Sequence, residues 1–146
     1  MNQFKISFSK LDHNDVFRLL KRSSPQFNPP LNDSIDIEQY SEKLSKFASF
    51  LTCSVNNCIE AFIAFYPNQD TSIAYVSLVW VDEHHRGKGI AKAMFEEFFK
   101  KCLSIGLRYS DLEVLKNNHE AANLYAALGY KIMADHQCKN LLRITL

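Results

Sequence analysis

The spacing of hydrophobic residues changes along the chain, and each change predicts a different element. Apolar and polar residues alternate over Gln3–Phe8, which predicts a short strand. The spacing then becomes helical after a candidate N-cap near Asp12, so we expect a helix that runs to about Arg22. The proline-rich segment Ser24–Leu31 follows and is expected to be a loop between two helices.

A second helix is predicted after this loop. Asp36 and Gln39 have the spacing of a capping box, in which each residue satisfies a free backbone N–H at the start of a helix. The apolar stripe that follows consists of Ile37, Tyr40, Leu44, Phe47, Ala48 and Leu51. The strand pattern is therefore expected to return only at about Thr52.

Three strands are predicted in the middle of the chain. Asn56-Asn57 is expected to be a turn that leads into a strand at Ile59–Tyr66, and Pro67–Asp70 is expected to be the next turn. The run Ser72–Val81 is rich in β-branched and aromatic residues without clean alternation, which is typical of a central strand covered on both faces.

The C-terminal half alternates between helical and strand patterns. One side of a long predicted helix carries Ile90, Ala93, Met94, Phe98, Cys102 and Leu103. Gly106 is expected to end this helix, and the later elements are a strand at Tyr109–Leu115, a helix at Glu120–Leu128 ended by Gly129, and strands around Lys131–Ala134 and Leu141–Leu146. This order predicts an α/β protein with a central sheet and helices on both faces.

Composition narrows the class of protein. A length of 146 residues suits a single domain, 1-146, and 47% hydrophobic with 23% charged residues is an ordinary globular balance. A net charge of +1 disfavours binding to nucleic acid or to an acidic membrane through bulk charge. The longest apolar stretches, such as Ala61–Tyr66, are too short to cross a bilayer, and the N-terminus has no apolar signal region. We therefore expect a soluble, cytoplasmic protein.

The cysteines and histidines predict no metal site. Four cysteines are few for a disulfide scaffold, so we expect reduced thiols. Cys53 and Cys58 have no second pair of ligands at the spacing of a zinc finger, and the histidines form no His-x-x-x-His pattern.

Two of the four glycines indicate a binding site. Gly87 and Gly89 lie between the most apolar predicted strand and the longest predicted helix. A glycine loop at this point directs backbone N–H groups and the positive end of the helix dipole toward a ligand, and Arg86, Lys88 and Lys92 add positive charge. The segment therefore predicts a phosphate site, and the alternative is a solvated glycine turn.

The residues of this loop do not match either of two common nucleotide-binding motifs. It lacks Gly-x-x-x-x-Gly-Lys-Ser/Thr, and a dinucleotide fingerprint that began at Gly87 would need a third glycine where Lys92 stands. The string Arg86-Gly87-Lys88-Gly89-Ile90-Ala91 instead fits Arg/Gln-x-x-Gly-x-Gly/Ala and resembles the pyrophosphate loop of the GCN5-related N-acetyltransferase (GNAT) superfamily.

A second motif carries the same resemblance. Leu112-Glu113-Val114 is followed by Asn118-x-x-Ala121-x-x-Leu124-Tyr125-x-x-Leu128-Gly129-Tyr130, which is similar to the next motif of that superfamily. Both motifs occur in order with a helix and a strand between them. The resemblance covers about Ser72 to Ala134.

Membership of the superfamily implies a fold and a co-substrate. The implied fold is a single GNAT-like α/β (α+β) domain whose central sheet is mixed, mostly antiparallel and splayed between strands 4 and 5. Acetyl-CoA is the implied donor, with its pyrophosphate on the amides of Arg86–Ala91 and its pantetheine arm along Val79, Trp80 and Val81. Asn118 is expected either to contact the pantetheine or to fix the start of its helix. Trp80 stands where the family often has a smaller residue.

The resemblance also assigns two catalytic roles. Tyr125 is the expected proton donor to the departing thiolate of CoA and is counted among the cofactor contacts. Glu113 lies twelve residues before it and is the expected general base, which would remove a proton from the amine. A base acting through water, or Glu83, is the alternative.

The acceptor is left open by the sequence. Direct transfer of the acetyl group to a primary amine is expected, with an amino sugar or another small amine as acceptor. A protein N-terminus or lysine is the competing acceptor, and a non-catalytic CoA-binding module is the rival class of protein. No partner other than acetyl-CoA and the acceptor is expected, except that a homodimer is left open.

Overall fold

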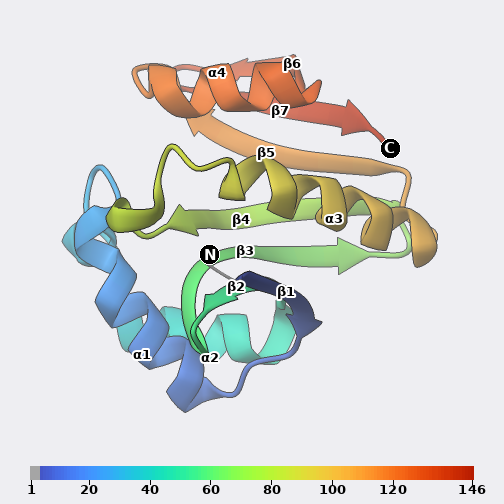
Figure 1. Cartoon of the computed structure of the whole chain (residues 1–146). Coiled ribbons are helices and arrows are strands. Elements are labelled where there is room, and N and C mark those ends of the chain that lie inside the picture. The colour runs from blue at the N-terminus through green and yellow to red at the C-terminus, as the bar shows by residue number, and fades with distance from the viewer. Residues whose placement is uncertain (1–3) are drawn as a thin grey trace. The chain divides into compact units, whose positions relative to one another are not determined.

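The computed structural model of the chain describes residues 4–146, in which seven strands are hydrogen-bonded in the order β1-β2-β3-β4-β5-β7-β6 (Figure 1). The strands are β1 Phe4–Ser9, β2 Ser49–Val55, β3 Cys58–Asn68, β4 Ile73–Val81, β5 Tyr109–Leu115, β6 Lys131–His136 and β7 Lys139–Thr145. The α-helices are α1 His13–Ser23, α2 Ile37–Phe47, α3 Ile90–Ser104 and α4 His119–Leu128, and the short 3-10 helices are η1 Ser24–Gln26, η2 Leu31–Asp33 and η3 Glu83–His85.

The fold class predicted from the sequence is confirmed. The sheet is mixed, since β4 and β5 are parallel whereas β1–β2, β5–β7 and β6–β7 are antiparallel. The parallel pairs run from Ile73 opposite Tyr109 to Val76 opposite Leu112, and both strands continue beyond the last pair, as expected for a sheet that splits at this point. Gln3, the first residue of the predicted N-terminal strand, lies outside the described residues.

The chain forms two compact units, and the first unit contains residues 4–64 and 78–94. Its strands β1 and β2 pair with Phe4 opposite Val55 and Ser9 opposite Phe50, and α1 and α2 lie side by side (Figure 1). The caps predicted for both helices are present, because the carboxylates of Asp12 and Asp36 accept hydrogen bonds from backbone N–H groups three residues on. The side chains at its centre include Val16, Leu20, Leu44, Phe50 and Phe62, none of which is exposed.

The predicted C-terminal end of the second helix is wrong. α2 ends at Phe47, Ala48 already has an extended backbone, and Leu51 lies opposite Phe8 in β2. Ala48 and Leu51 are fully buried, whereas Phe47 is 64% exposed. The buried residues of β2 occupy both of its faces, so its sequence does not alternate between apolar and polar residues. Without that alternation, Ala48 and Leu51 happened to fit the helical spacing of the preceding residues.

The second unit contains residues 65–77 and 95–146. Aromatic rings fill much of its interior, and Phe95 contacts the rings of Phe98, Tyr125 and Tyr130 at centroid distances of 5.9, 5.9 and 6.2 Å. Leu103, which the sequence placed on the apolar side of its helix, is 54% exposed. Five residues separate it from Phe98, which puts it about 140° around the helix from that buried ring.

Among the residues that the structure describes, none of the helices combines the length and the apolar character that crossing a membrane requires.

Candidate functional site

The loop between β4 and α3 has the backbone that the glycine pattern predicts. Gly87 and Gly89 have φ values of +76° and +78°, in the left-handed region that favours glycine. A Cβ added to either residue would meet nothing within 4 Å, so the backbone conformation and not a lack of space requires glycine here. The loop is otherwise exposed and ends where Ile90 becomes buried at the start of α3.

Backbone amides at the start of α3 precede the helical hydrogen bonds. The first helical hydrogen bond runs from Ala93 N to Gly89 O at 3.1 Å. The N–H groups of Ile90, Ala91 and Lys92 precede it and therefore have no acceptor within the helix. The helix dipole gives this end of α3 a partial positive charge, and the side chains of Lys88 and Lys92 are exposed beside it. The segment can therefore bind an anion with main-chain donors.

Arg86 stabilises the loop itself. Its Nε donates a hydrogen bond of 2.9 Å to the carbonyl oxygen of Val81, the last residue of β4. This contact connects the two ends of the turn. Arg86 thus holds the loop against β4 and also adds positive charge at its surface.

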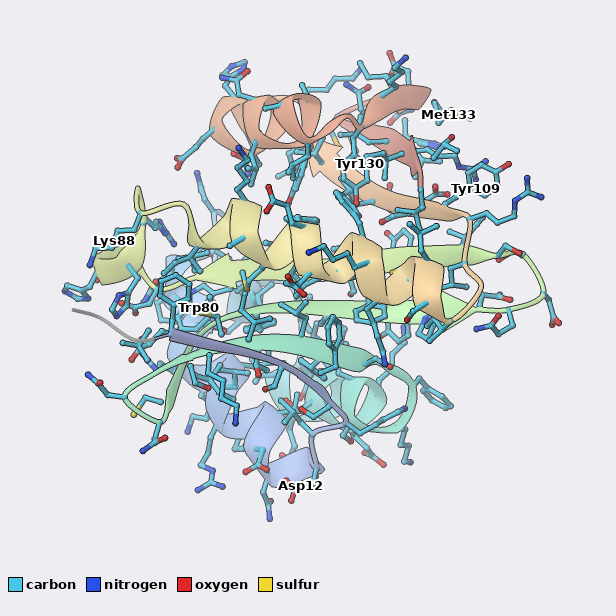
Figure 2. All side chains as sticks on the ribbon, turned by 45° about the vertical axis from the view of Figure 1, so that its right-hand side comes forward. Asp12, Trp80, Lys88, Tyr109, Tyr130 and Met133 are labelled. Atoms are coloured by element: carbon cyan, nitrogen blue, oxygen red, sulfur yellow. The ribbon has the colours of Figure 1, made fainter. Side chains whose placement is uncertain are left out.

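Trp80 points into the first unit and not toward the loop. Its side chain is 2% exposed, its indole Nε1 donates to Oε1 of Gln26 at 3.1 Å, and its ring packs against Phe62 at 5.8 Å (Figure 2). The flanking Val79 and Val81 are half-buried. The indole of Trp80 is therefore turned into the first unit. Lys88 lies out on the loop (Figure 2).

Asp82 connects the end of β4 to α1 and η1. Its carboxylate accepts hydrogen bonds from Gln26 Nε2 at 3.1 Å and from His84 N at 3.0 Å, and Arg22 lies 3.4 Å from the same group. Burial alone would raise the pKa of Asp82, but these hydrogen bonds and the guanidinium outweigh it and lower the pKa to about 2. Oε1 of Gln26 also accepts from Glu83 N at 2.9 Å, so the backbone that enters the loop is fixed by these contacts.

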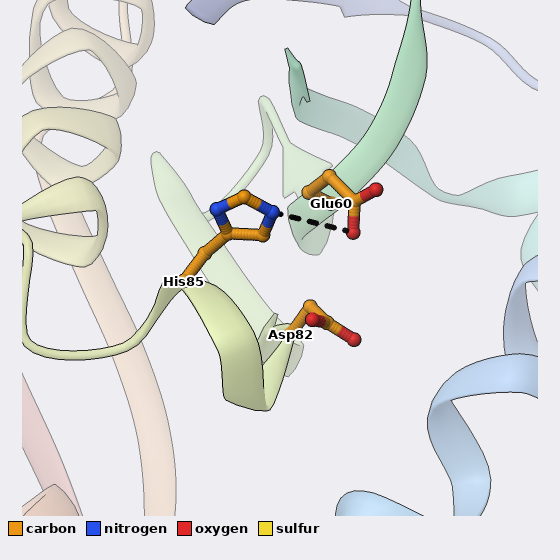
Figure 3. A group of neighbouring side chains, drawn as sticks. All are labelled: Glu60, Asp82 and His85. Atoms are coloured by element: carbon orange, nitrogen blue, oxygen red, sulfur yellow. Dashed lines mark ion pairs between the residues drawn. The ribbon is translucent and has the colours of Figure 1, made fainter. Parts of the chain in front are cut away.

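Three possible metal ligands meet beside this network, a grouping that the sequence did not indicate. Glu60, Asp82 and His85 each place one ligand atom within 4.8 Å of the others, and His85 Nε2 lies 3.9 Å from Glu60 (Figure 3). Arg22 donates to the carboxylate of Glu60 and lies beside that of Asp82, so a guanidinium already contacts both groups. These contacts account for the grouping as an ion-pair network. Asp82 and His85 are three residues apart, but Glu60 lies 22 residues before Asp82 on another strand, so the three form no local motif.

Tyr125 lies in the interior of the second unit. Its side chain is 8% exposed, and its ring contacts Phe95 and Tyr130. Burial raises the pKa of Tyr125 to about 12, so the phenol is protonated at neutral pH. The neighbouring Tyr130 is hydrogen-bonded to Ser110 of β5 at 2.7 Å, which places both rings on the Ser110 face of that strand.

Glu113 is exposed on the opposite face of β5. The residues of β5 alternate, and the side chain of Asp111, on the same face as Glu113, binds Arg143 of β7 with hydrogen bonds of 2.7 and 2.9 Å. Oε1 of Glu113 accepts a hydrogen bond of 3.0 Å from the phenol of Tyr75 in β4, a partner that the sequence did not indicate. The structure therefore does not bring Glu113 and Tyr125 into direct contact.

The remaining predicted residues are placed as follows. Asn118 is the N-cap of α4, because its Oδ1 accepts a hydrogen bond of 3.2 Å from Ala121 N. A contact of Asn118 with the pantetheine stays a prediction. Glu83, the alternative base, is exposed in η3 of the first unit. The loop Arg86–Ala91 and the end of β4 belong to the first unit, whereas Glu113, Asn118 and Tyr125 belong to the second.

Comparison with known proteins identifies the family. The model of the acetyltransferase (GNAT) family matches residues 14–130, so the chain belongs to this family. The L-ornithine N5-acetyltransferase NATA1 of Arabidopsis thaliana is 26% identical over 119 residues, which are 77% of this chain and 51% of that protein. The chain thus spans about half the length of the curated relative that it matches.

Solved structures show the same fold. PaiA N-acetyltransferase from Thermoplasma acidophilum in complex with coenzyme A has a TM-score of 0.79 and 17% identity, with 97% of this chain and 99% of that chain covered. A GNAT-family acetyltransferase from Staphylococcus aureus Mu50 has a TM-score of 0.73 and 15% identity, with 97% and 99% covered. At these identities the likeness is one of fold.

Proposed function

We propose that the protein is an N-acetyltransferase that transfers the acetyl group of acetyl-CoA directly to the primary amine of a small molecule. The observation that carries this proposal is the loop with left-handed Gly87 and Gly89 at the start of α3, in a chain that belongs to the GNAT family. Two comparisons support it, since the curated relative is named as an L-ornithine N5-acetyltransferase and a protein of the same fold was solved in complex with coenzyme A.

The loop is proposed to bind the pyrophosphate of CoA. The amides of Ile90, Ala91 and Lys92 and the dipole of α3 would hold the phosphate oxygens, with Arg86 and Lys88 adding positive charge. The pantetheine arm would run along the backbone of β4 from Val79 to Val81, where its amides can pair with strand N–H and C=O groups. The buried orientation of Trp80 supports this, because its side chain is turned away into the first unit.

Acetyl transfer to an amine requires two proton movements. An alkyl amine has a pKa of about 10.4 and is protonated at neutral pH, so a base must produce the free nucleophile. Glu113 is proposed for this role because it is an exposed carboxylate on β5. The departing thiolate needs a proton, and Tyr125 is the proposed donor because it matches the tyrosine of the family motif and its phenol is protonated at neutral pH.

The position of these two groups supports separate roles. Glu113 and Tyr125 lie on opposite faces of β5, so each would serve a different reacting group and neither would exchange a proton with the other. The proposed acceptor is a small primary amine. Because the curated relative is named for L-ornithine, amino acids with a side-chain amine join amino sugars as candidates.

A binding titration combined with a thiol-release assay tests the proposal. The protein is expected to bind CoA, and to release free thiol from acetyl-CoA only when an acceptor such as ornithine, spermidine, glucosamine or a peptide is added. ATP and NAD serve as control ligands and should not compete with CoA. Tight CoA binding without thiol release for any amine would identify a non-catalytic binding module instead, and no CoA binding would remove the loop assignment.

A further inference from the structure

A phenol and a carboxylate are hydrogen-bonded to each other in the second unit. The hydroxyl of Tyr75 donates to Oε1 of Glu113 at 3.0 Å across the parallel pair β4–β5. Tyr75 is opposite Asp111 in the register, so Glu113, two residues further along β5, is its diagonal neighbour. Thirty-eight residues separate the two in sequence, and Tyr75 lies outside both motifs quoted above for the family resemblance.

Glu113 carries a negative charge that the structure does not compensate. The nearby Asp111 is neutralised by two hydrogen bonds from Arg143, whose guanidinium lies 4.9 Å from the centre of the Tyr109 ring. Within residues 4–146, Glu113 is in no ion pair, although it is exposed. One unpaired carboxylate on this face is complementary to one external cation.

Tyr75 restricts the orientation of this carboxylate. An exposed glutamate samples many rotamers, and fixing it costs conformational entropy each time a ligand binds. The half-buried phenol occupies one oxygen of Glu113 in advance and leaves Oε2 for a ligand, and a hydrogen bond to a charged acceptor is among the stronger ones in proteins. A carboxylate held in this way is prepared for a cation that must arrive in one position.

We propose that Tyr75 is a positioning residue that holds Glu113 in place to bind the protonated amine of the acceptor. This inference rests on the proposed acetyltransferase function and adds the recognition of the charged group. Selectivity for the cation comes from Glu113, and Tyr75 acts through it.

The proton balance of the step is complete. The carboxylate of Glu113 takes one proton from the ammonium, and the freed nitrogen forms a C–N bond with the thioester carbon while the C–S bond breaks. The sulfur leaves with the bonding electrons and takes a proton from Tyr125. The second proton of the nitrogen passes to solvent water as the amide forms. Tyr125 is then reprotonated from solvent, Glu113 returns its proton to solvent, and one proton is released overall.

The experiment compares Tyr75→Phe and Glu113→Gln with the control Tyr109→Phe. Tyr109 is the matched control because its phenol belongs to the same strand region and its ring contacts Arg143 and not Glu113. With the best acceptor, Tyr75→Phe is expected to lower kcat/KM for the amine about 10-fold or more, on the magnitude of a hydrogen bond to a charged group. The KM for acetyl-CoA and the CoA affinity should stay at the wild-type value, and Tyr109→Phe should behave as wild type.

Two further readouts separate positioning from a structural effect. A trimethylammonium analogue of the acceptor, which cannot react, should inhibit the wild type more strongly than its neutral tert-butyl isostere. Tyr75→Phe should weaken inhibition by the cation and not by the neutral analogue. Adding Tyr75→Phe to Glu113→Gln should produce no further loss, because the phenol then has no carboxylate to hold.

The outcomes are distinguishable. Wild-type turnover in Tyr75→Phe overturns this inference and leaves the proposed function intact. So does a double variant whose loss of activity, expressed as free energy, equals the sum of the losses in the two single variants. A wild-type protein that binds no CoA and releases no thiol overturns the proposed function, and this inference with it.

Discussion

Single side chains at the end of β4 determine how the loop between β4 and α3 is held. Asp82 is 5% exposed and receives donors from Gln26 and His84. The sequence predicted the loop because its glycines and cations are adjacent in the chain. It could not predict Gln26 as a partner of Asp82, or Arg22 as a partner of Glu60, because 56 and 38 residues separate these pairs. For the same reason the sequence could not predict Tyr75 as the partner of Glu113, since 38 residues separate them.

Asp82→Asn should destabilise the protein by about 2 kcal/mol at neutral pH. The magnitude follows from the pKa of Asp82, which is lowered from 3.8 to about 2, because each pKa unit corresponds to about 1.4 kcal/mol. The folded state binds the proton more weakly than the unfolded state does. The contribution of Asp82 is therefore fully present above about pH 4 and is lost as the pH falls toward 2. Urea unfolding of wild type and variant at several pH values measures it.

The matched control is Asp15→Asn, which removes an exposed ion pair with Arg18. A change within about 0.5 kcal/mol is expected there. If the difference between wild type and Asp82→Asn were the same at pH 3 and pH 7, the ionised carboxylate would not be its source.

Tyr125→Phe should lower the turnover number by about 100-fold or more, on the magnitude of general acid catalysis. The ring contacts with Phe95 and Tyr130 remain in phenylalanine, so stability and CoA affinity should change little. Steady-state kinetics with a saturating amine, together with calorimetric titration of CoA, measures both quantities. Turnover at the wild-type rate would remove the acid role from Tyr125.

At the scale of elements, caps and glycine turns were predictable, but the boundary between α2 and β2 was not. Asp12, Asp36 and Asn118 cap their helices through local side-chain hydrogen bonds, which sequence patterns record directly. The end of α2 depends instead on Leu51 pairing with Phe8 of β1. A non-local pairing of this kind leaves no signal in the spacing of apolar residues.

Gly89→Ala should weaken CoA binding by about 10-fold or more, since a left-handed φ of +78° strains alanine and turns the amides at the start of α3 away from the ligand. Gly106→Ala is the control, because Gly106 has a similar φ of +87° but ends α3 and lies outside the loop. Both substitutions should cost about 1 kcal/mol in unfolding free energy. Equal CoA affinity in the two variants would show that the loop conformation does not matter for binding.

At the scale of the whole molecule, the order of elements followed from the sequence, and the family motifs explain why. The two motifs lie on the segments that precede α3 and that form β5 and α4, so the predicted order of strand, loop, helix, strand and helix is the observed one. The sequence did not predict how the acceptor would be recognised. The proposed recognition of its amine depends on Tyr75 of β4 and Glu113 of β5, which come together only after the two strands pair.

The position of Trp80 has a spectroscopic consequence. The chain contains a single tryptophan, and its indole is buried, bonded to Gln26 and 5.3 Å from the guanidinium of Arg22. All intrinsic tryptophan fluorescence therefore originates at the end of β4, two residues before the network around Asp82. The native protein carries its own unlabelled optical reporter of the strand that leads into the loop.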